Sequence, residues 1–353
     1  MNGRAGLAGV GVALALLWSC ATPARPLGSA ATGAETPAPT EPPLRHLTLA
    51  NTSLGAASAF FVAQDVGIFA RYGLDVEIPL ISGVKSVQSL VARQAEYALI
   101  SSRTVVDSQL GGADVIMLAG VTPTLVFSVY GLPQVVDVSH LRGKTIGVTQ
   151  IGGSADFALR YALRRQGLEA DRDYTIFQTG GMAESLAALQ AGGVQATVLS
   201  PPTTVKARKE GLREVVDITA LGIDYVTSAL ATSRAFLADE PAVNRRFLQA
   251  MLEGIHYAKT NPTATKQVLA RQYQTADADV LDETYALYVD RLLPRVPLVS
   301  LRGIETVLEE IVASDPGSPA AQAARAASAA QFVDNAPLAE LEASDFVSRL
   351  WAE

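Results

Sequence analysis

The hydrophobic positions of this chain alternate between two periods from about residue 45 onward. Short apolar runs predict buried strands, and stretches with apolar residues three or four positions apart predict helices. In the first half of the body these patterns predict strands at 46–50, 74–80 and 97–100, with helices over 57–72 and about 84–94 between them. Because strands and helices alternate, the pattern predicts a parallel sheet.

The same order of strands and helices returns after residue 144. Strands are predicted at 144–149, 174–178 and 196–199, and helices begin at Ser154, the expected N-cap, and over 183–191. Two explanations are open: two similar lobes, or a chance likeness between helix–strand pairs in an alanine-rich chain. The shared serine- and glycine-containing loops favour two similar lobes.

Two segments rich in Val, Thr and Leu, 115–130 and 215–236, are interpreted as crossings between the lobes. Two lobes joined in this way can hinge about a cleft, which suits closure on a ligand. Beyond residue 240 the pattern is helical. Helices are predicted at 241–260, 262–273, 279–293 and 301–314, with further helix from 319 to 332 and at the end of the chain. The predicted fold class is α/β, with two α/β lobes, two crossing segments and C-terminal helices.

The N-terminus has the pattern of an export signal followed by a tether. Arg4 precedes an apolar run from Ala5 to Trp18, which is too short to span a bilayer because a spanning helix needs ~20 apolar residues. With Cys20 directly behind it, the run resembles the lipobox of bacterial lipoproteins. The alternative is an ordinary secretory signal with an incidental cysteine. We predict a signal peptide over 1–19 and a lipid-anchored, disordered tether over 20–43, so that the protein acts outside the cytoplasm.

Composition excludes several classes of partner. The formal net charge is -7 and no basic cluster with interleaved aromatic residues is present, so no nucleic acid is expected. Three scattered histidines, without C-x-x-C or H-E-x-x-H spacing, leave the usual zinc sites without a ligand set, and we expect no metal and no cofactor. The single cysteine allows no intramolecular disulfide, so the core alone must hold the body together.

Four stretches resemble the substrate-binding proteins of bacterial ABC importers, specifically the aliphatic sulfonate, nitrate, taurine and thiamine-pyrimidine type. They read A-Q-D-V-G-I-F-A-R-Y-G-L-D-V at 63–76, L-R-G-K-T-I-G-V-T at 141–149, G-G-S at 152–154, and L-A-A-L-Q-A-G-G-V-Q-A-T-V at 186–198. The resemblance covers about residues 45–314. It departs from the family in the turn 93–97, which lacks the frequent Gly-Asp pair and leaves the geometry of that turn open.

The resemblance implies a type II periplasmic-binding fold. Its first lobe is discontinuous and would comprise 44–125 and 226–353, whereas the second would comprise 126–225. Parallel crossovers bring the carboxyl ends of the strands to one edge of each sheet, and ligands bind there. We therefore expect a ligand between the loop 52–53 of the first lobe and the loop 152–154 of the second.

Hydroxyl groups and free backbone N–H groups at helix starts suit an anionic or strongly hydrogen-bonding ligand. The predicted ligand-binding residues are Thr52, Ser53, Gly83, Ser101, Ser102, Thr122, Thr149, Gly152, Gly153, Ser154, Gly181, Ser200 and Tyr225. Structural roles compete with this interpretation, because Ser154 could only cap its helix and Ser101 could only close a turn. Likewise, the aromatic residues Phe60, Phe61, Tyr130 and Tyr225 could floor the cleft or fill the core. If the cleft interpretation holds, Ser154→Trp should block the ligand and spare the fold.

The resemblance implies a monomeric extracytoplasmic lipoprotein that captures a small organic ligand and delivers it to the permease subunits of an ABC importer. An enzyme on the same fold, of the menaquinone- or thiamine-precursor type, is the alternative. Thiamine-pyrimidine synthases use a cysteine-rich iron motif, and the one cysteine here is assigned to lipid. No nucleophile–base pair can be assembled either, since Ser154 has Asp156 nearby but no histidine. We therefore expect no enzyme, although a ligand sensor for a membrane signalling partner would have the same sequence.

Overall fold

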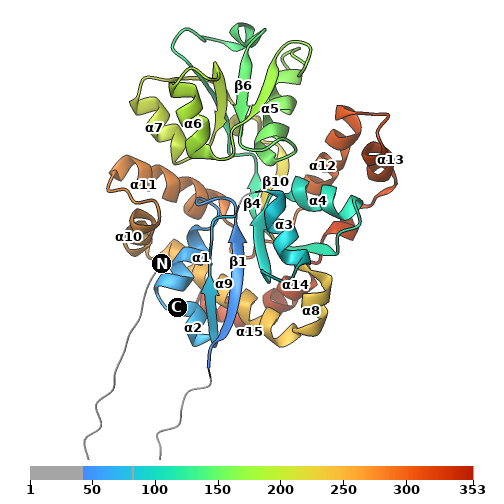
Figure 1. Ribbon diagram of the computed structural model, residues 1–353. Coiled ribbons are helices and arrows are strands. Elements are labelled where there is room, and N and C mark those ends of the chain that lie inside the picture. The colour runs from blue at the N-terminus through green and yellow to red at the C-terminus, as the bar shows by residue number, and fades with distance from the viewer. Residues whose placement is uncertain (1–42, 82, 353) are drawn as a thin grey trace, which may run out of the picture. The chain divides into compact units, whose positions relative to one another are not determined.

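The computed structural model describes residues 43–81 and 83–352, so the predictions for the signal peptide, the lipid anchor at Cys20 and nearly all of the tether lie outside the described residues. The described chain forms two α/β lobes, each built around a five-stranded sheet (Figure 1). The strands of the first sheet are β1 Arg45–Asn51, β2 Leu74–Glu77, β3 Tyr97–Ile100, β4 Val115–Thr124 and β10 Asp224–Ser233. Those of the second are β5 Ser128–Gly131, β6 Thr145–Val148, β7 Thr175–Gln178, β8 Ala196–Leu199 and β9 Arg213–Asp217.

The two sheets repeat one topology. Their strand orders are β2-β1-β3-β10-β4 and β7-β6-β8-β5-β9. In each sheet a parallel trio is followed by an antiparallel strand that belongs to a crossing segment. The repeat predicted from the sequence is thus confirmed, and so is the α/β class. The second sheet lies entirely between residues 128 and 217, while the lobe boundaries themselves stay a prediction.

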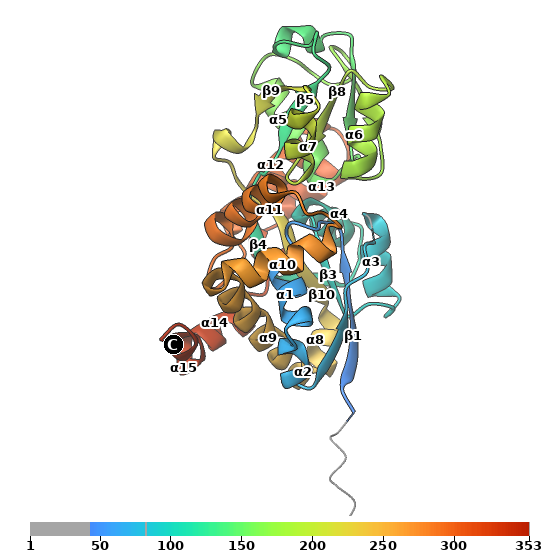
Figure 2. The same ribbon diagram turned by 90° about the vertical axis from the view of Figure 1, so that its left-hand side faces the viewer.

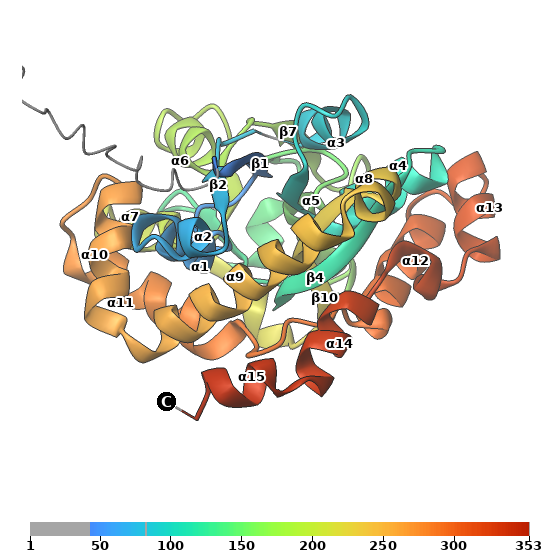
Figure 3. The same ribbon diagram turned by 90° about the horizontal axis from the view of Figure 1, so that it is seen from below.

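Helices flank both sheets. Those among the strands are α1 Ser58–Asp65, α2 Ile68–Arg71, α3 Val84–Val91, α4 Ser102–Leu110, α5 Ser154–Arg164, α6 Met182–Gln190 and α7 Thr203–Lys209. After β10 follow α8 Arg234–Asp239, α9 Pro241–Thr260, α10 Pro262–Gln272, α11 Ala278–Thr284, α12 Leu301–Ser314, α13 Pro319–Ala326, α14 Ala336–Ala343 and α15 Asp345–Leu350. Seen from below, α9 runs across the first lobe with α10 and α11 on one side and α12 and α13 on the other (Figure 3).

Aromatic packing fixes α9 against the first sheet. The rings of Tyr97 in β3 and Phe247 in α9 stack with centroids 3.8 Å apart, and the Tyr97 hydroxyl donates to Asn244 Oδ1 at 2.7 Å. A stacked ring with a satisfied phenol combines apolar burial with a directional bond, so it specifies the position of the helix. Four aromatic residues were candidates for the cleft floor: Phe60, Phe61, Tyr130 and Tyr225. Each is at most 3% exposed, and none lines the cavity described below. These four are core residues.

Three helix predictions need correction. The helix expected over 57–72 is interrupted at Gly67, whose φ of 72° is a left-handed conformation that ends α1 before α2 begins. The helix expected over 279–293 is α11 followed by a π-helix at Tyr285–Leu292. Gly153, and not Ser154, occupies the N-cap of α5, and the Ser154 side chain bonds elsewhere.

Candidate functional site

A cavity of about 360 Å³ lies between the two lobes. Loops that follow parallel strands of both sheets line it, as the convergence argument predicts. Of the predicted ligand-binding residues, the ones that line it are Thr52, Ser53, Gly83, Ser101, Thr149, Gly153, Ser154, Gly181 and Ser200. The structure therefore brings these residues together, while their contact with a ligand stays a prediction.

Four predicted residues do not line the cavity. Ser102 is fully buried at the start of α4, and Thr122 is 1% exposed within β4. Gly152 does not line the cavity, although its neighbour Gly153 does. Its φ of 78° is one that a residue with a side chain rarely adopts. The fully buried Tyr225 reaches the lining only through its hydroxyl group. For all four residues, these positions favour a structural role over direct contact with a ligand in the cavity.

The hydroxyl of Ser154 belongs to a cluster at the base of the cavity. Its Oγ lies 2.8 Å from Ser101 Oγ, 3.3 Å from the Tyr225 hydroxyl and 3.1 Å from the carbonyl oxygen of Thr227. One hydroxyl proton serves only one acceptor at a time, so Ser154 donates to one of these groups and accepts from another. Burial raises the pKa of Tyr225, which keeps its phenol protonated and available as a donor.

The opposite wall of the cavity is apolar and aromatic. Tyr288 is 5% exposed, and its ring packs directly on Gly55: a Cβ at Gly55 would lie 2.3 Å from Tyr288 Cε2. The second phenol, Tyr273, donates to the carbonyl oxygen of Leu54 at 3.1 Å. Further apolar side chains that line the cavity are Leu54, Leu80, Ile100, Val126, Phe127, Met182 and Val280. Such a wall suits the carbon skeleton of an organic ligand.

Two charged side chains of the described residues line the cavity, and neither was predicted from the sequence. Lys206 comes from α7 and Glu184 from the first turn of α6. Lys85 and Arg103, the basic residues nearest the predicted loops in sequence, are not among the lining residues, and Arg103 pairs with Asp107 at 2.8 Å. One available signal was that α7 directly follows the loop after β8, which puts its first turns at the ligand edge.

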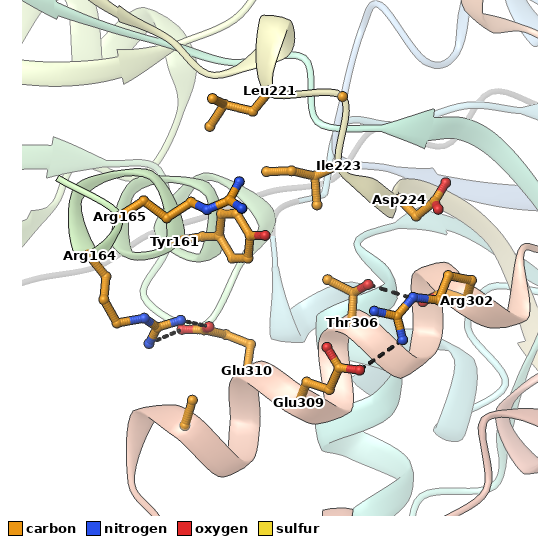
Figure 4. A pocket seen from close by; sticks show the side chains of 12 residues that line it. Tyr161, Arg164, Arg165, Leu221, Ile223, Asp224, Arg302, Thr306, Glu309 and Glu310 are labelled. Atoms are coloured by element: carbon orange, nitrogen blue, oxygen red, sulfur yellow. Dashed lines mark hydrogen bonds and ion pairs between the residues drawn. The ribbon is translucent and has the colours of Figure 1, made fainter.

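A second cavity of about 370 Å³ lies beside the crossing segment 221–224 (Figure 4). Residues of α5 and α12 form its other walls. Most of its charged side chains neutralise each other, because Arg164 pairs with Glu310, and Arg302 bonds Glu309 at 2.8 Å. The cavity is therefore a polar junction between the lobes.

Within residues 43–81 and 83–352, no group of three or more His, Cys, Asp or Glu side chains is placed to hold a metal ion. None of the helices in that part of the chain has the length and apolar character needed to cross a membrane.

Comparison with known proteins identifies the architecture. Residues 56–265 match the family model described as NMT1/THI5 like. Riboflavin-binding protein RibY from Chloroflexus aurantiacus is 24% identical over 267 residues, which cover 72% of this chain and 74% of RibY. The periplasmic nitrate-binding protein NrtA from Synechocystis PCC 6803 has a TM-score of 0.71 at 15% identity, covering 87% of this chain and 91% of NrtA. The alkanesulfonate-binding protein SsuA from Xanthomonas axonopodis pv. citri, bound to MOPS, has a TM-score of 0.66 at 17% identity. The match covers 85% of this chain and 98% of SsuA. These likenesses confirm the predicted two-lobed periplasmic-binding fold.

Proposed function

The chain belongs to the NMT1/THI5-like family, and from this premise we propose that it is the solute-binding component of an ABC-type import system. The observation that carries the proposal is the cavity of about 360 Å³ whose walls come from both lobes. A ligand held there contacts both lobes at once, so binding stabilises their approach. The names of the three relatives, which bind riboflavin, nitrate and an alkanesulfonate, support a small-molecule role.

The proposed ligand is a small organic molecule with an apolar or aromatic body. Aromatic rings from Tyr288, Tyr273 and Phe127 would contact this body, and the serine and threonine hydroxyls would bind its polar groups. Lys206 would be placed to meet an anionic group. An inorganic ion such as nitrate would leave most of this apolar wall without contacts, so riboflavin-like compounds and organic sulfonates are favoured over nitrate.

A binding measurement tests this function. Purified protein is titrated calorimetrically with riboflavin, MOPS, taurine and nitrate, and its melting temperature is followed in parallel. We expect one organic compound to bind and to raise the melting temperature, since a ligand at 100 times its Kd adds ~2.7 kcal/mol of stability. The bound compound should be recovered chemically unchanged. Turnover of the compound would indicate an enzyme, and binding of nitrate alone would contradict the proposed ligand class.

Lys206→Ala separates the ligand chemistry from the fold. The side chain is exposed on α7, so we expect the melting temperature of the unliganded protein to stay within about 1 °C, because a surface change costs little. Affinity for an anionic ligand should fall at least tenfold. Lys144→Ala, an exposed lysine elsewhere on the same lobe, is the matched control and should leave the affinity unchanged.

We further propose that the protein acts outside the cytoplasm, tethered by lipid at Cys20. The proposal rests on the residue pattern before Cys20 and on the periplasmic location of the structurally similar NrtA. Cys20→Ala should release the protein from the membrane fraction, whereas Ser19→Ala should leave it anchored. Retention of the Cys20→Ala variant in washed membranes would overturn the lipid anchor without affecting the binding function.

A further inference from the structure

The segment 273–288 forms a wall of the cavity from outside the family-matched region. That region ends at residue 265, whereas four lining residues come from beyond it: Tyr273, Thr275, Val280 and Tyr288. The segment starts directly after α10, which ends at Gln272, and comprises the following turn, α11 and the first half of the π-helix. π-helical turns are rare and recur at functional sites. This wall is therefore a part of the ligand site that the family model does not describe.

Helix α7 faces this wall from the second lobe. It contributes Thr203 and Lys206 to the same cavity, and it packs against β5 and β9 of the second sheet. In both side views α7 lies above α11, and the two helices are in contact (Figures 1 and 2). The two helices thus meet at the edge of the cavity.

Ion pairs join α7 to the wall. Arg208 bonds both carboxylate oxygens of Glu283 in α11. Lys209 Nζ donates to both oxygens of Asp277 at 2.7 Å and lies 2.7 Å from Asp279 Oδ2. We call these residues the clasp: Arg208, Lys209, Asp277, Asp279 and Glu283.

Ion pairing favours the charged forms of Arg208, Lys209 and Asp277. The hydrogen bonds that Lys209 donates to Asp277 and Asp279 raise the pKa of Lys209, and the bond from Lys209 lowers the pKa of Asp277. Within the described part of the chain, Tyr130 also touches the clasp: its hydroxyl is 3.4 Å from Arg208 Nη1. This contact comes from within the second lobe, so it orients Arg208 without bridging the lobes.

We propose that Arg208 and Lys209 are positioning residues that set the ligand affinity without touching the ligand, by clasping the segment 273–288 to the second lobe. The proposal rests on the proposed function. When the lobes separate, the ion pairs part, and the four lining residues of the wall move away from Lys206. The clasp therefore favours the closed arrangement in which both walls contact the ligand.

The expected effect is moderate because the clasp is exposed. Its side chains are 34% to 69% exposed, and solvent-exposed ion pairs contribute little individually. Breaking this network of three ion pairs should lower the ligand affinity by about 3- to 10-fold. High salt should also weaken ligand binding, because it screens the ion pairs of the clasp: the screening length falls from ≈ 10 Å at 0.1 M to 3 Å at 1 M.

A charge-swap cycle on the full chain tests the clasp. The variants are Arg208→Glu, Glu283→Arg and the double variant that carries both. Lys144→Glu makes the same change in net charge as Arg208→Glu, at an exposed position outside the clasp, so it is the control for that variant. Hydrogen exchange is measured for the peptides that contain α7 and α11, and Kd and the dissociation rate are measured with riboflavin and with MOPS.

We expect each single variant to raise exchange in both α7 and α11 and to speed dissociation of the probe that binds. The swapped double variant should restore both properties, which a loss of local structure in either helix would not allow. Unchanged exchange in the single variants, or no restoration in the double variant, would overturn the clasp. Failure of both probes to bind the wild type would contradict the proposed ligand class, and the exchange arm would still decide the clasp.

Discussion

The hydroxyl oxygen of Ser154 lies 2.8 Å from that of Ser101, and this bond joins the first residue of α5 in the second lobe to the residue that follows β3 in the first. The Tyr225 hydroxyl completes the cluster, at 3.4 Å from Ser101 and 3.3 Å from Ser154. Tyr225 itself stands at the start of β10, where the second crossing enters the first sheet. The cluster therefore couples both lobes to a crossing segment.

The first prediction concerns this coupling. Ser101→Ala and Ser154→Ala should each lower the free energy of unfolding by about 1 kcal/mol, the usual net value of a hydrogen bond. Because they share a bond, the double variant should lose less than the sum of the two. Denaturant unfolding measures all three, and strict additivity would show that the two hydroxyls do not interact.

From the sequence, Ser154→Trp was expected to block the ligand and spare the fold, whereas the structure predicts that this variant disturbs folding. Ser154 is only 8% exposed and is surrounded by the cluster, so an indole cannot be placed there without displacing neighbours. We expect loss of folding or a large fall in the melting temperature. A folded variant that had lost only ligand binding would restore the interpretation from sequence.

The second prediction concerns the contact between Gly55 and Tyr288. Gly55→Ala would place its Cβ 2.3 Å from Tyr288 Cε2, a distance that real contacts do not reach, so the ring must move. Overpacking of this kind costs about 1–3 kcal/mol, which denaturant unfolding can measure. Adding Tyr288→Leu should relieve the clash and recover part of the loss. No recovery would mean that the strain arises elsewhere.

The third prediction concerns the ion pair beside the second cavity. The Glu310 side chain is 3% exposed, pairs with Arg164 and accepts a bond from Ser314 Oγ at 3.0 Å. Arg164→Met leaves that carboxylate buried without its cation, which should cost about 3–5 kcal/mol. Arg164→Met combined with Glu310→Leu removes both charges and should be markedly more stable than the single variant. Thermal unfolding of the two variants decides this.

The fourth prediction concerns alkaline pH. Burial raises the pKa of Tyr288 to about 12 and raises that of Tyr273 as well. A phenol with a raised folded pKa stabilises the fold fully below its unfolded value of ~10, and this contribution is lost as pH rises through the folded value. The melting temperature should therefore fall between pH 10 and 12. Tyr288→Phe removes the ionising group and should make the fall shallower, and an identical slope would contradict the assignment.

Local patterns were sufficient for much of the fold. Strands 97–100 and 196–199 and helices 241–260 and 301–314 were predicted with the bounds that the structure has, because each is a long or strongly apolar stretch between clear start and stop signals. The break at Gly67 was not predicted, since a single glycine inside a helical pattern is compatible with either outcome. The π-helix at 285–292 was missed because an ordinary helix gives nearly the same periodicity.

The candidate site was predictable only in part. Loops after parallel strands had to converge, so Thr52, Ser53, Thr149 and Gly153 could be placed at the cavity from the order of elements. Lys206 was missed because it lies a helical turn beyond its loop. Tyr288 was missed because it comes from a helix far along the chain, where nothing local relates it to Gly55.

The sequence by itself determined the two-lobed α/β class, the repeat of strand and helix, and the edge at which a ligand would bind, because periodicity, turn residues and strand direction are local properties. Only the tertiary structure decided that the Ser154 hydroxyl turns to Ser101 and Tyr225, that Tyr288 rests on Gly55, and that Arg208 pairs with Glu283. These contacts join residues 53 or more positions apart in the chain. Their partners are selected by how whole elements pack, and a local pattern does not contain that information.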